Sequence, residues 1–436
     1  MSGLAELEAA IDRRMLLRLG AAAGIGAALM PRLAWAAAQP DLLANVRQVI
    51  ERWVGPGKFP GMVASLGLAG REPLYVARGS EGFLDADPVT PDSLFRIYSM
   101  TKPVTGMAAM MLIEEGRLGL DQPLYDILPK FREMQVQVTP DGPLTELAPA
   151  RQPIRIRNLL THTAGLGWDF VQKGPISQLM LDRGLIAWQV SRMQIPGISH
   201  NRPVASLEKF ADGLAEVPLF YEPGTKWSYS FGLDLMGRVI EVVSGKSFDA
   251  FLKEHIFEPA GMHDTGFRVP ATQAHRLTTN YGVVAGTLVP IDKGGASIYL
   301  DEPAFPFGGA GLVSSPRDYD RFLRMLAGYG TIGGKRVMGQ WAVRTGTSNL
   351  LPEGVLGPAA PAPASQFGAG GRVGVGPEAG IYGWSGAAGT VGMVDMRNGL
   401  TSGIFVQFMP PNALDLLPEF QKALKADVTA LLEKTS

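Results

Sequence analysis

Ser99-Met100-Thr101-Lys102 is the stretch on which the interpretation of this chain depends. Ser99 and Lys102 are three residues apart, so on a helix their side chains project from one face, one turn from each other. The amine then lies within reach of the hydroxyl, which is what a serine needs to become a nucleophile without a histidine. Pro103 places the stretch in a first helical turn, where the positive end of the helix dipole favours a developing alkoxide.

Apolar residues at helical spacing continue this helix as far as Leu112, and Gly116 is expected to end it. We expect the helix to be buried along one stripe and to hold Ser99 rigidly. A second stretch, Ser206-Leu207-Glu208-Lys209, fits the same Ser-x-x-Lys pattern. There we interpret Ser206 as the N-cap of a surface helix.

Length and composition limit the class of protein. The chain has 436 residues, 46% of them hydrophobic, which suffices for one large core or two closely packed subdomains. A formal net charge of -1 gives no electrostatic case for nucleic acid binding. The absence of cysteine excludes a thiol nucleophile and a cysteine metal site. No His-Glu-x-x-His motif is present, so neither a metal nor a cofactor is expected.

The first 38 residues have the pattern of an export signal. Arg13-Arg14 precedes an apolar stretch over 19–30 that is too short to span a membrane. Ala36 and Ala38 are small residues at the spacing that a signal peptidase accepts. We therefore expect a twin-arginine signal over 1–38, cleaved after Ala36 or Ala38, and a periplasmic or secreted mature chain over 39–436 without a membrane anchor. The other interpretation is a chance Ala-rich amphipathic N-terminus.

Strand patterns gather at the two ends of the mature chain, and helical patterns fill its middle. Asn398-Gly399 is a two-residue hairpin signal between strands over 390–396 and 400–409, and the turn near Gly70-Arg71 joins two strands close to the N-terminus. The fold class is therefore α/β (α+β): an antiparallel sheet built from both chain ends, flanked by helices, with a large and mainly helical insertion. We expect a sheet subdomain from about 39–100 and 327–436 and a helical subdomain over about 101–326. The remaining elements are a helix over 40–53, strands over 62–68 and 74–77, a long loop or flap over 351–380, and a final helix with Leu417, Phe420 and Leu424 on one stripe.

Tyr229 lies on a short extended stretch that follows a Pro-Gly turn. A tyrosine on such a loop can point its phenol into a cleft. Beside the Lys102 ammonium its pKa would fall, which would let it exchange protons with Ser99. The alternative is a tyrosine that packs its ring and hydrogen-bonds its hydroxyl for structural reasons.

The stretch 383–389 combines a strand pattern with three glycines. Glycine in a strand allows close approach of another backbone or a ligand. We expect an edge strand that binds substrate and supplies one amide of an oxyanion hole. The alternative is a bulge or a tight sheet crossing without a ligand.

Ser-x-x-Lys, then Tyr229, then Trp384-Ser385-Gly386 is an order that resembles the serine β-lactamase and penicillin-recognising superfamily. Three further strings are similar to that superfamily: LLTHTAGL at 159–166, PAGMHDTGF at 259–267 and GGAGLVSS at 308–315. The resemblance implies a β-lactamase/transpeptidase-like fold over nearly the whole mature chain. It also implies Ser99 as nucleophile, Lys102 and Tyr229 as the shared general base and acid, and the amides of Ser99 and Ala387 as the oxyanion hole. His162, in the first string, is expected to be buried and structural.

Two departures from the superfamily pattern indicate the substrate. Phe231 occupies the asparagine position of Tyr-x-Asn, and Trp384-Ser385-Gly386 replaces Lys-Thr-Gly. The missing lysine removes a cation that would pair with a carboxylate, and the missing amide removes a hydrogen-bond donor. We therefore expect a binding pocket formed by Trp384, Ser385, Gly386 and Phe231 that accepts small uncharged esters of short to medium acyl length. This pattern resembles the family VIII carboxylesterases.

Other functions share single features with this sequence. Gly383-Trp384-Ser385-Gly386-Ala387 approaches the G-x-S-x-G elbow of α/β-hydrolases, but it ends in alanine and no histidine follows it. Within the superfamily, a β-lactamase, a D-amino-acid amidase or aminopeptidase, and an acyltransferase stay open, because water, amines and alcohols can all resolve one acyl-enzyme. A non-catalytic peptidoglycan-binding relative would have no need to keep Ser99, Lys102 and Tyr229 together.

Overall fold

The computed structural model describes residues 42–435, except for 69–70, 169–170, 196–201 and 359–364. The expected export signal and the start of the expected helix over 40–53 lie outside the described residues. Helix α5 (Ala44–Trp53) accounts for the rest of that helix. Within the described ranges, every helix is too short or too polar to cross a bilayer.

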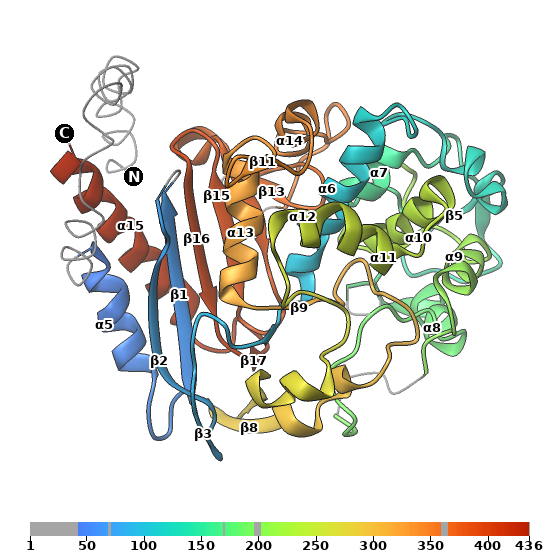
Figure 1. Ribbon diagram of the computed structural model, residues 1–436. Helices are drawn as coiled ribbons and strands as arrows, with labels where there is room; N and C mark the ends of the chain where they lie inside the picture. Colours follow the sequence, from blue (N-terminus) through green and yellow to red (C-terminus); the bar gives the residue numbers. More distant parts are fainter. Residues whose placement is uncertain (1–41, 69–70, 169–170, 196–201, 359–364, 436) are drawn as a thin grey trace.

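An eight-stranded antiparallel sheet dominates one side of the molecule (Figure 1). Its order is β12-β13-β14-β15-β16-β1-β2-β3, and β1 pairs with both β2 and β16. The two ends of the chain therefore meet at β1, which confirms the predicted sheet. Its strands are β1 (Gly61–Leu68), β2 (Leu74–Gly82), β3 (Asp85–Pro88), β12 (Gln366–Phe367), β13 (Arg372–Val373), β14 (Ile381–Ser385), β15 (Val391–Asp395) and β16 (Leu400–Phe405).

Helices cover both faces of this sheet, which explains why β1 is buried from Gly61 to Gly67. Met62, Ala64 and Leu66 share a core with α5 and with α15 (Leu416–Thr435) on one face. Val63 points the other way, into the main core that contains Tyr319 of α13 (Pro316–Ala327). The alternation follows from the two-residue period of a strand. Helix α13 thus packs on the sheet, although it lies at the end of the segment assigned to the helical insertion.

The C-terminal hairpin differs from its prediction. Asp395 pairs with Leu400, so residues 396–399 form a four-residue turn rather than a two-residue one. The Asp395 carboxylate accepts hydrogen bonds from the amides of Arg397 and Asn398, which stabilises the longer turn. Strand β16 ends at Phe405, and β17 (Phe408–Met409) pairs in parallel with β7 (Asn280–Val284) in a smaller sheet with β8 (Thr287–Asp292).

Helix α6 (Thr101–Glu114) runs between α10 (Gly232–Ser244), α14 (Gln340–Gly346) and β14. Its residues from Thr101 to Leu112 are all buried. The prediction of a single buried stripe is therefore wrong, because the helix crosses the centre of the molecule and has packing partners on every side. Its predicted end at Gly116, which has a φ of +69°, is confirmed.

The other helices lie mainly on the side of α6 away from the sheet, most of them around α10 (Figure 1). They are α7 (Ile156–Leu160), α8 (Gly174–Asp182), α9 (Leu207–Ala215), α11 (Phe248–Leu252) and α12 (Glu258–Ala260). The Ser206 hydroxyl accepts the Lys209 amide at the start of α9, so its predicted N-cap role is confirmed. The expected flap over 351–380 is irregular in part and contributes the edge strand β12 and its neighbour β13.

Candidate active site

Ser99 lies in a 3₁₀ turn, η2 (Tyr98–Met100), that leads directly into α6. The preceding residue, Tyr98, has a φ of +41°, a left-handed conformation that non-glycine residues rarely adopt. Such backbone persists only where the surroundings determine it, and it is concentrated at functional sites. Here the Ile97 amide donates to the carbonyl of Leu312, and the buried Arg96 side chain donates to the Asp292 carboxylate, at 2.8 Å for its Nε. The backbone that leads into the Ser99 turn is therefore fixed by two distant segments of the chain.

Lys102 lies one helical turn after Ser99, and its side chain has no exposed surface. Its Nζ lies 3.3 Å from Ser99 Oγ and donates to the carbonyl of Gly309 at 2.7 Å. The same nitrogen lies 4.4 Å from the ring centre of Trp168. Burial lowers the pKa of Lys102 to about 7, and the charge of Asp234 opposes this effect by raising it. Lys102 can therefore be neutral near pH 7, as a general base must be.

Tyr229 reaches the same hydroxyl from the loop before α10. Its Oη donates to Ser99 Oγ at 2.7 Å. The ring is stacked on Trp168, with ring centres 4.8 Å apart, and lies 6.0 Å from the ring of Trp384 on its other side. Burial raises the pKa of Tyr229, although hydrogen bonds with Ser99 and Trp384 lower it. The expectation of a lowered pKa is wrong, because desolvation has the largest effect; Tyr229 is a neutral donor and Lys102 is the group that can act as base.

Strand β14 passes beside the Ser99 turn, but it is not the edge strand of the sheet as predicted. The neighbouring β13 pairs only with Tyr382 and Gly383 of β14. Trp384 and Ser385 extend beyond this pairing, so the open edge that the prediction required exists over these two residues. Trp384 Nε1 donates to Tyr229 Oη at 3.4 Å, and Ser385 is exposed.

Gly386 and Ala387 form the turn after β14. A Cβ at Gly386 would collide with the Ile97 carbonyl, so this glycine permits the close approach of two backbones that the sequence indicated. Ala387 is half-buried, and among the described residues its amide donates to no hydrogen-bond acceptor. An oxyanion hole requires such a free amide.

The other two predicted residues, Phe231 and His162, are both buried. Phe231 has no exposed surface and packs against Trp168 and Phe210, so it supports the wall of the site from behind and does not face substrate. His162 is buried, and its Nδ1 accepts the amide of Ser230 at 3.2 Å. Burial and the nearby Lys102 charge lower the pKa of His162 well below its ordinary value, so the neutral imidazole fixes the Tyr229 loop.

Sequence reasoning missed Asp234, Trp168 and the carbonyl of Gly309. Asp234 has no exposed surface and accepts the Gly309 amide at 2.7 Å. A single carboxylate within the apolar run Leu233-Asp234-Leu235-Met236 was the available signal, since a buried acid needs a partner. Trp168 carried no comparable signal, because aromatic residues near a predicted core are common.

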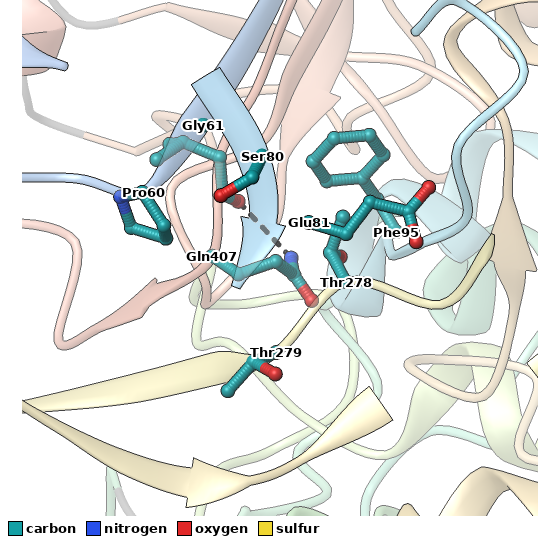
Figure 2. A pocket seen from close by; sticks show the side chains of 9 residues that line it. Pro60, Gly61, Ser80, Glu81, Phe95, Thr278, Thr279 and Gln407 are labelled. Atoms are coloured by element: carbon teal, nitrogen blue, oxygen red, sulfur yellow. Dashed lines mark hydrogen bonds between the residues drawn. The ribbon is translucent and has the colours of Figure 1, made fainter. Parts of the chain in front are cut away.

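Two hollows lie away from these residues. One has a volume of about 440 Å³ and is lined by Arg155, Arg157 and the loop that contains Pro223. The other, shown in Figure 2, has a volume of about 10 Å³ and lies beside Glu81. Ser99, Lys102 and Tyr229 line neither hollow. Over the described residues, no cluster of acidic and histidine side chains is suited to a metal ion.

Relatives of this chain were found by sequence. An uncharacterized protein of Mycobacterium tuberculosis is 35% identical over 279 residues, which is 62% of this chain and 64% of that protein. The match thus spans less than two thirds of that relative's length. The esterase EstB of Burkholderia gladioli is 29% identical over 306 residues, covering 66% of this chain and 70% of the esterase.

Solved structures share the fold. EstCE1, described as a hydrolase with promiscuous acyltransferase activity, has 25% identity and a TM-score of 0.71, covering 89% of this chain and 99% of its own. A family VIII carboxylesterase has 19% identity and a TM-score of 0.62, covering 88% and 97%, which shows the fold alone. The β-lactamase/transpeptidase-like fold and the predicted superfamily resemblance are confirmed. The Beta-lactamase family model matches residues 46–426, and the chain belongs to this family.

Proposed function

We propose that this chain is a carboxylesterase that forms an acyl-enzyme on Ser99. One observation carries the proposal: Tyr229 Oη and Lys102 Nζ lie 2.7 Å and 3.3 Å from the same Ser99 oxygen. The esterase among the relatives supports the choice of substrate. A hydroxyl that contacts both an amine with a lowered pKa and a phenol has the arrangement of an activated nucleophile.

Each proton transfer in the proposed reaction has a named donor and a named acceptor. Neutral Lys102 accepts the Ser99 proton as Oγ attacks the ester carbonyl, and the amides of Ser99 and Ala387 receive the negative charge on the carbonyl oxygen. As the C–O bond of the tetrahedral intermediate breaks, Tyr229 gives its proton to the leaving alkoxide, and the Lys102 ammonium returns a proton to Tyr229. Lys102 is then neutral again, ready to deprotonate the water that attacks the acyl-enzyme.

The replacement of lysine by Trp384 supports uncharged esters of short to medium acyl length as the substrates. Trp384 offers an apolar face and one N–H, which donates to Tyr229. A substrate carboxylate would find no cation at this position and would lose its hydration without compensation. The buried Phe231, in place of an amide, removes the donor for an acylamino side chain.

An acyltransferase is the second candidate. It is favoured by the similarity to EstCE1, whose description includes acyltransferase activity. In this reaction an alcohol replaces water in the second step, with Lys102 as the same base. Product analysis with an aryl butyrate in the presence of increasing concentrations of a primary alcohol separates the two: transfer dominates if the new ester forms faster than butyrate is released.

A covalent label tests the nucleophile. Reaction with a fluorophosphonate is expected to add one adduct, and peptide mapping should place it on Ser99. Ser99→Ala should lose both label and turnover while its thermal unfolding stays that of the unmodified protein. Ser206→Ala and Ser385→Ala are the matched controls and should keep the label. An adduct on Ser206 or Ser385 would contradict the mechanism.

A further inference from the structure

Asp234 is a buried carboxylate directly behind the Lys102 amine. It belongs to the first turn of α10, and its side chain has no exposed surface. Oδ1 accepts the amide of Gly309 at 2.7 Å, whereas Oδ2 has no hydrogen-bond partner among the described residues. A buried carboxylate that leaves one oxygen unsatisfied is costly, so its retention requires an explanation.

Gly309 connects the carboxylate to the lysine. Its amide donates to Asp234 and its carbonyl accepts from Lys102 Nζ, also at 2.7 Å. A Cβ at Gly309 would lie 2.5 Å from Asp234 Oδ2, so the carboxylate is packed directly against this backbone. Thr105 of α6 donates to the preceding carbonyl, that of Gly308, at 2.7 Å. The 308–311 segment is thereby clamped between α6 and α10.

Few titratable side chains of the described residues face Lys102. Among the described residues, the titratable groups that face Lys102 are Asp234 from α10, Tyr229 from the loop before it, and His162 from the loop after α7. Tyr229 and His162 are neutral for the reasons given above. Lys102 and Asp234 are therefore the only two groups of this set that exchange charge near neutral pH.

Burial acts on the two groups in opposite directions. It lowers the pKa of Lys102 to about 7 and raises the pKa of Asp234 to about 7, and the charge of each partner opposes the shift of the other. The ion pair and the fully neutral pair both have zero net charge. When Lys102 loses a proton while Asp234 gains one, neither group is left as an uncompensated charge in the core.

We propose that Asp234 is the positioning residue of Lys102: through Gly309 it fixes the amine beside Ser99, and its carboxylate sets the pH range in which that amine serves as base. This inference rests on the proposed function only in taking Lys102 as the base. Removal of the carboxylate charge would leave the Lys102 ammonium without compensation. The lysine would then be neutral to lower pH and a weaker proton acceptor.

Asp234→Asn is the informative variant, because its amide oxygen can still accept the Gly309 N–H. The readout is the rate of Ser99 phosphonylation by a fluorophosphonate between pH 4 and pH 9, which is independent of the natural substrate. We expect the acid limb of this pH–rate profile to move about one pH unit or more toward lower pH. The plateau rate of phosphonylation should fall about 3- to 10-fold. Asp234→Ser is a second neutral variant in case the first does not fold.

Asp320→Asn is the matched control. Asp320 is also buried and accepts from Thr401, on α13 and outside the site. Its acid limb should coincide with that of the unmodified protein.

An unchanged limb and plateau in Asp234→Asn would overturn the inference and reduce Asp234 to a structural hydrogen-bond acceptor. The unmodified protein supplies a further test without any variant. A limb below about pH 6 would contradict the inference, because burial unopposed by a carboxylate puts a lysine there. Absence of any label on Ser99 in the unmodified protein would instead contradict the proposed function.

Discussion

Tyr229→Phe separates the role of the phenol from that of the lysine. The substitution removes one oxygen and leaves the ring stacked on Trp168 at 4.8 Å and beside Trp384 at 6.0 Å. The lost contacts are the 2.7 Å hydrogen bond to Ser99 and the 3.4 Å hydrogen bond from Trp384. We therefore expect the variant to fold and to bind ester substrates much as the unmodified protein does.

The size of the effect depends on the leaving group. A hydrogen bond to a developing serine alkoxide contributes about 1.5–3 kcal/mol, which corresponds to roughly a 10- to 150-fold loss in kcat/KM. With a p-nitrophenyl ester this is the whole loss, since nitrophenolate leaves without a proton. An alkyl ester also needs the Tyr229 proton on its leaving alkoxide, and general acid catalysis contributes a further factor of about 10² or more.

The assay compares p-nitrophenyl butyrate with ethyl butyrate from pH 5 to pH 9. We expect a much larger loss for the ethyl ester. The acid limb of the pH–rate profile should stay where it is in the unmodified protein, because burial, opposed by the charge of Asp234, holds the pKa of the base, Lys102, at about 7. Equal losses for the two esters would show that Tyr229 gives no proton to the leaving group. Disappearance of the acid limb would show that Tyr229, and not Lys102, is the titrating base.

The remaining predictions concern the base, the specificity, the stability and the export of the protein. Lys102→Arg keeps a positive charge that cannot be given up, so turnover should fall about 10²-fold or more; near-normal turnover would mean that the lysine only supplies charge. Kinetics on both substrate classes should show kcat/KM for an aryl butyrate at least about thirty-fold above that for a cephalosporin, from roughly 2 kcal/mol of uncompensated desolvation. Trp384→Lys should narrow this gap, and equal efficiency in the unmodified protein would favour a β-lactamase. Burial raises the pKa of Glu81 to about 7, so the folded chain loses stability as the pH rises from the unfolded value of about 4.3 through 7. Glu81→Gln should raise the free energy of unfolding by roughly 1–3 kcal/mol at pH 8 and by little at pH 4, measured by urea denaturation; an equal gain at both values would exclude ionisation as the cause. We also propose periplasmic export through Arg13-Arg14, which cell fractionation would contradict if a double-lysine variant were exported unchanged.

The sequence alone determined the elements of the fold and the order of the chemical groups. Strand patterns bounded by turn residues at both chain ends predicted the strands. The spacing of Ser99 and Lys102 predicted that both lie on one helix face, because local geometry depends only on near neighbours in the chain. The predicted N-cap at Ser206 and the predicted helix end at Gly116 were correct for the same reason. The prediction of a two-residue turn at Asn398-Gly399 was wrong, because the Asp395 side chain accepts hydrogen bonds from backbone amides of the turn.

Only the tertiary structure decided how the site is charged. Whether Tyr229 or Lys102 acts as base depends on how burial shifts the pKa of each group and on which neighbours oppose the shift. These neighbours come from distant segments of the chain. Asp234 lies 132 positions after Lys102 in the sequence, yet one peptide segment at Gly309 connects them. No sequence pattern indicated that Phe231 would be buried behind Trp168. Electrostatic effects depend on distance and burial in space, and the order of residues in a chain does not contain these quantities until the chain is folded.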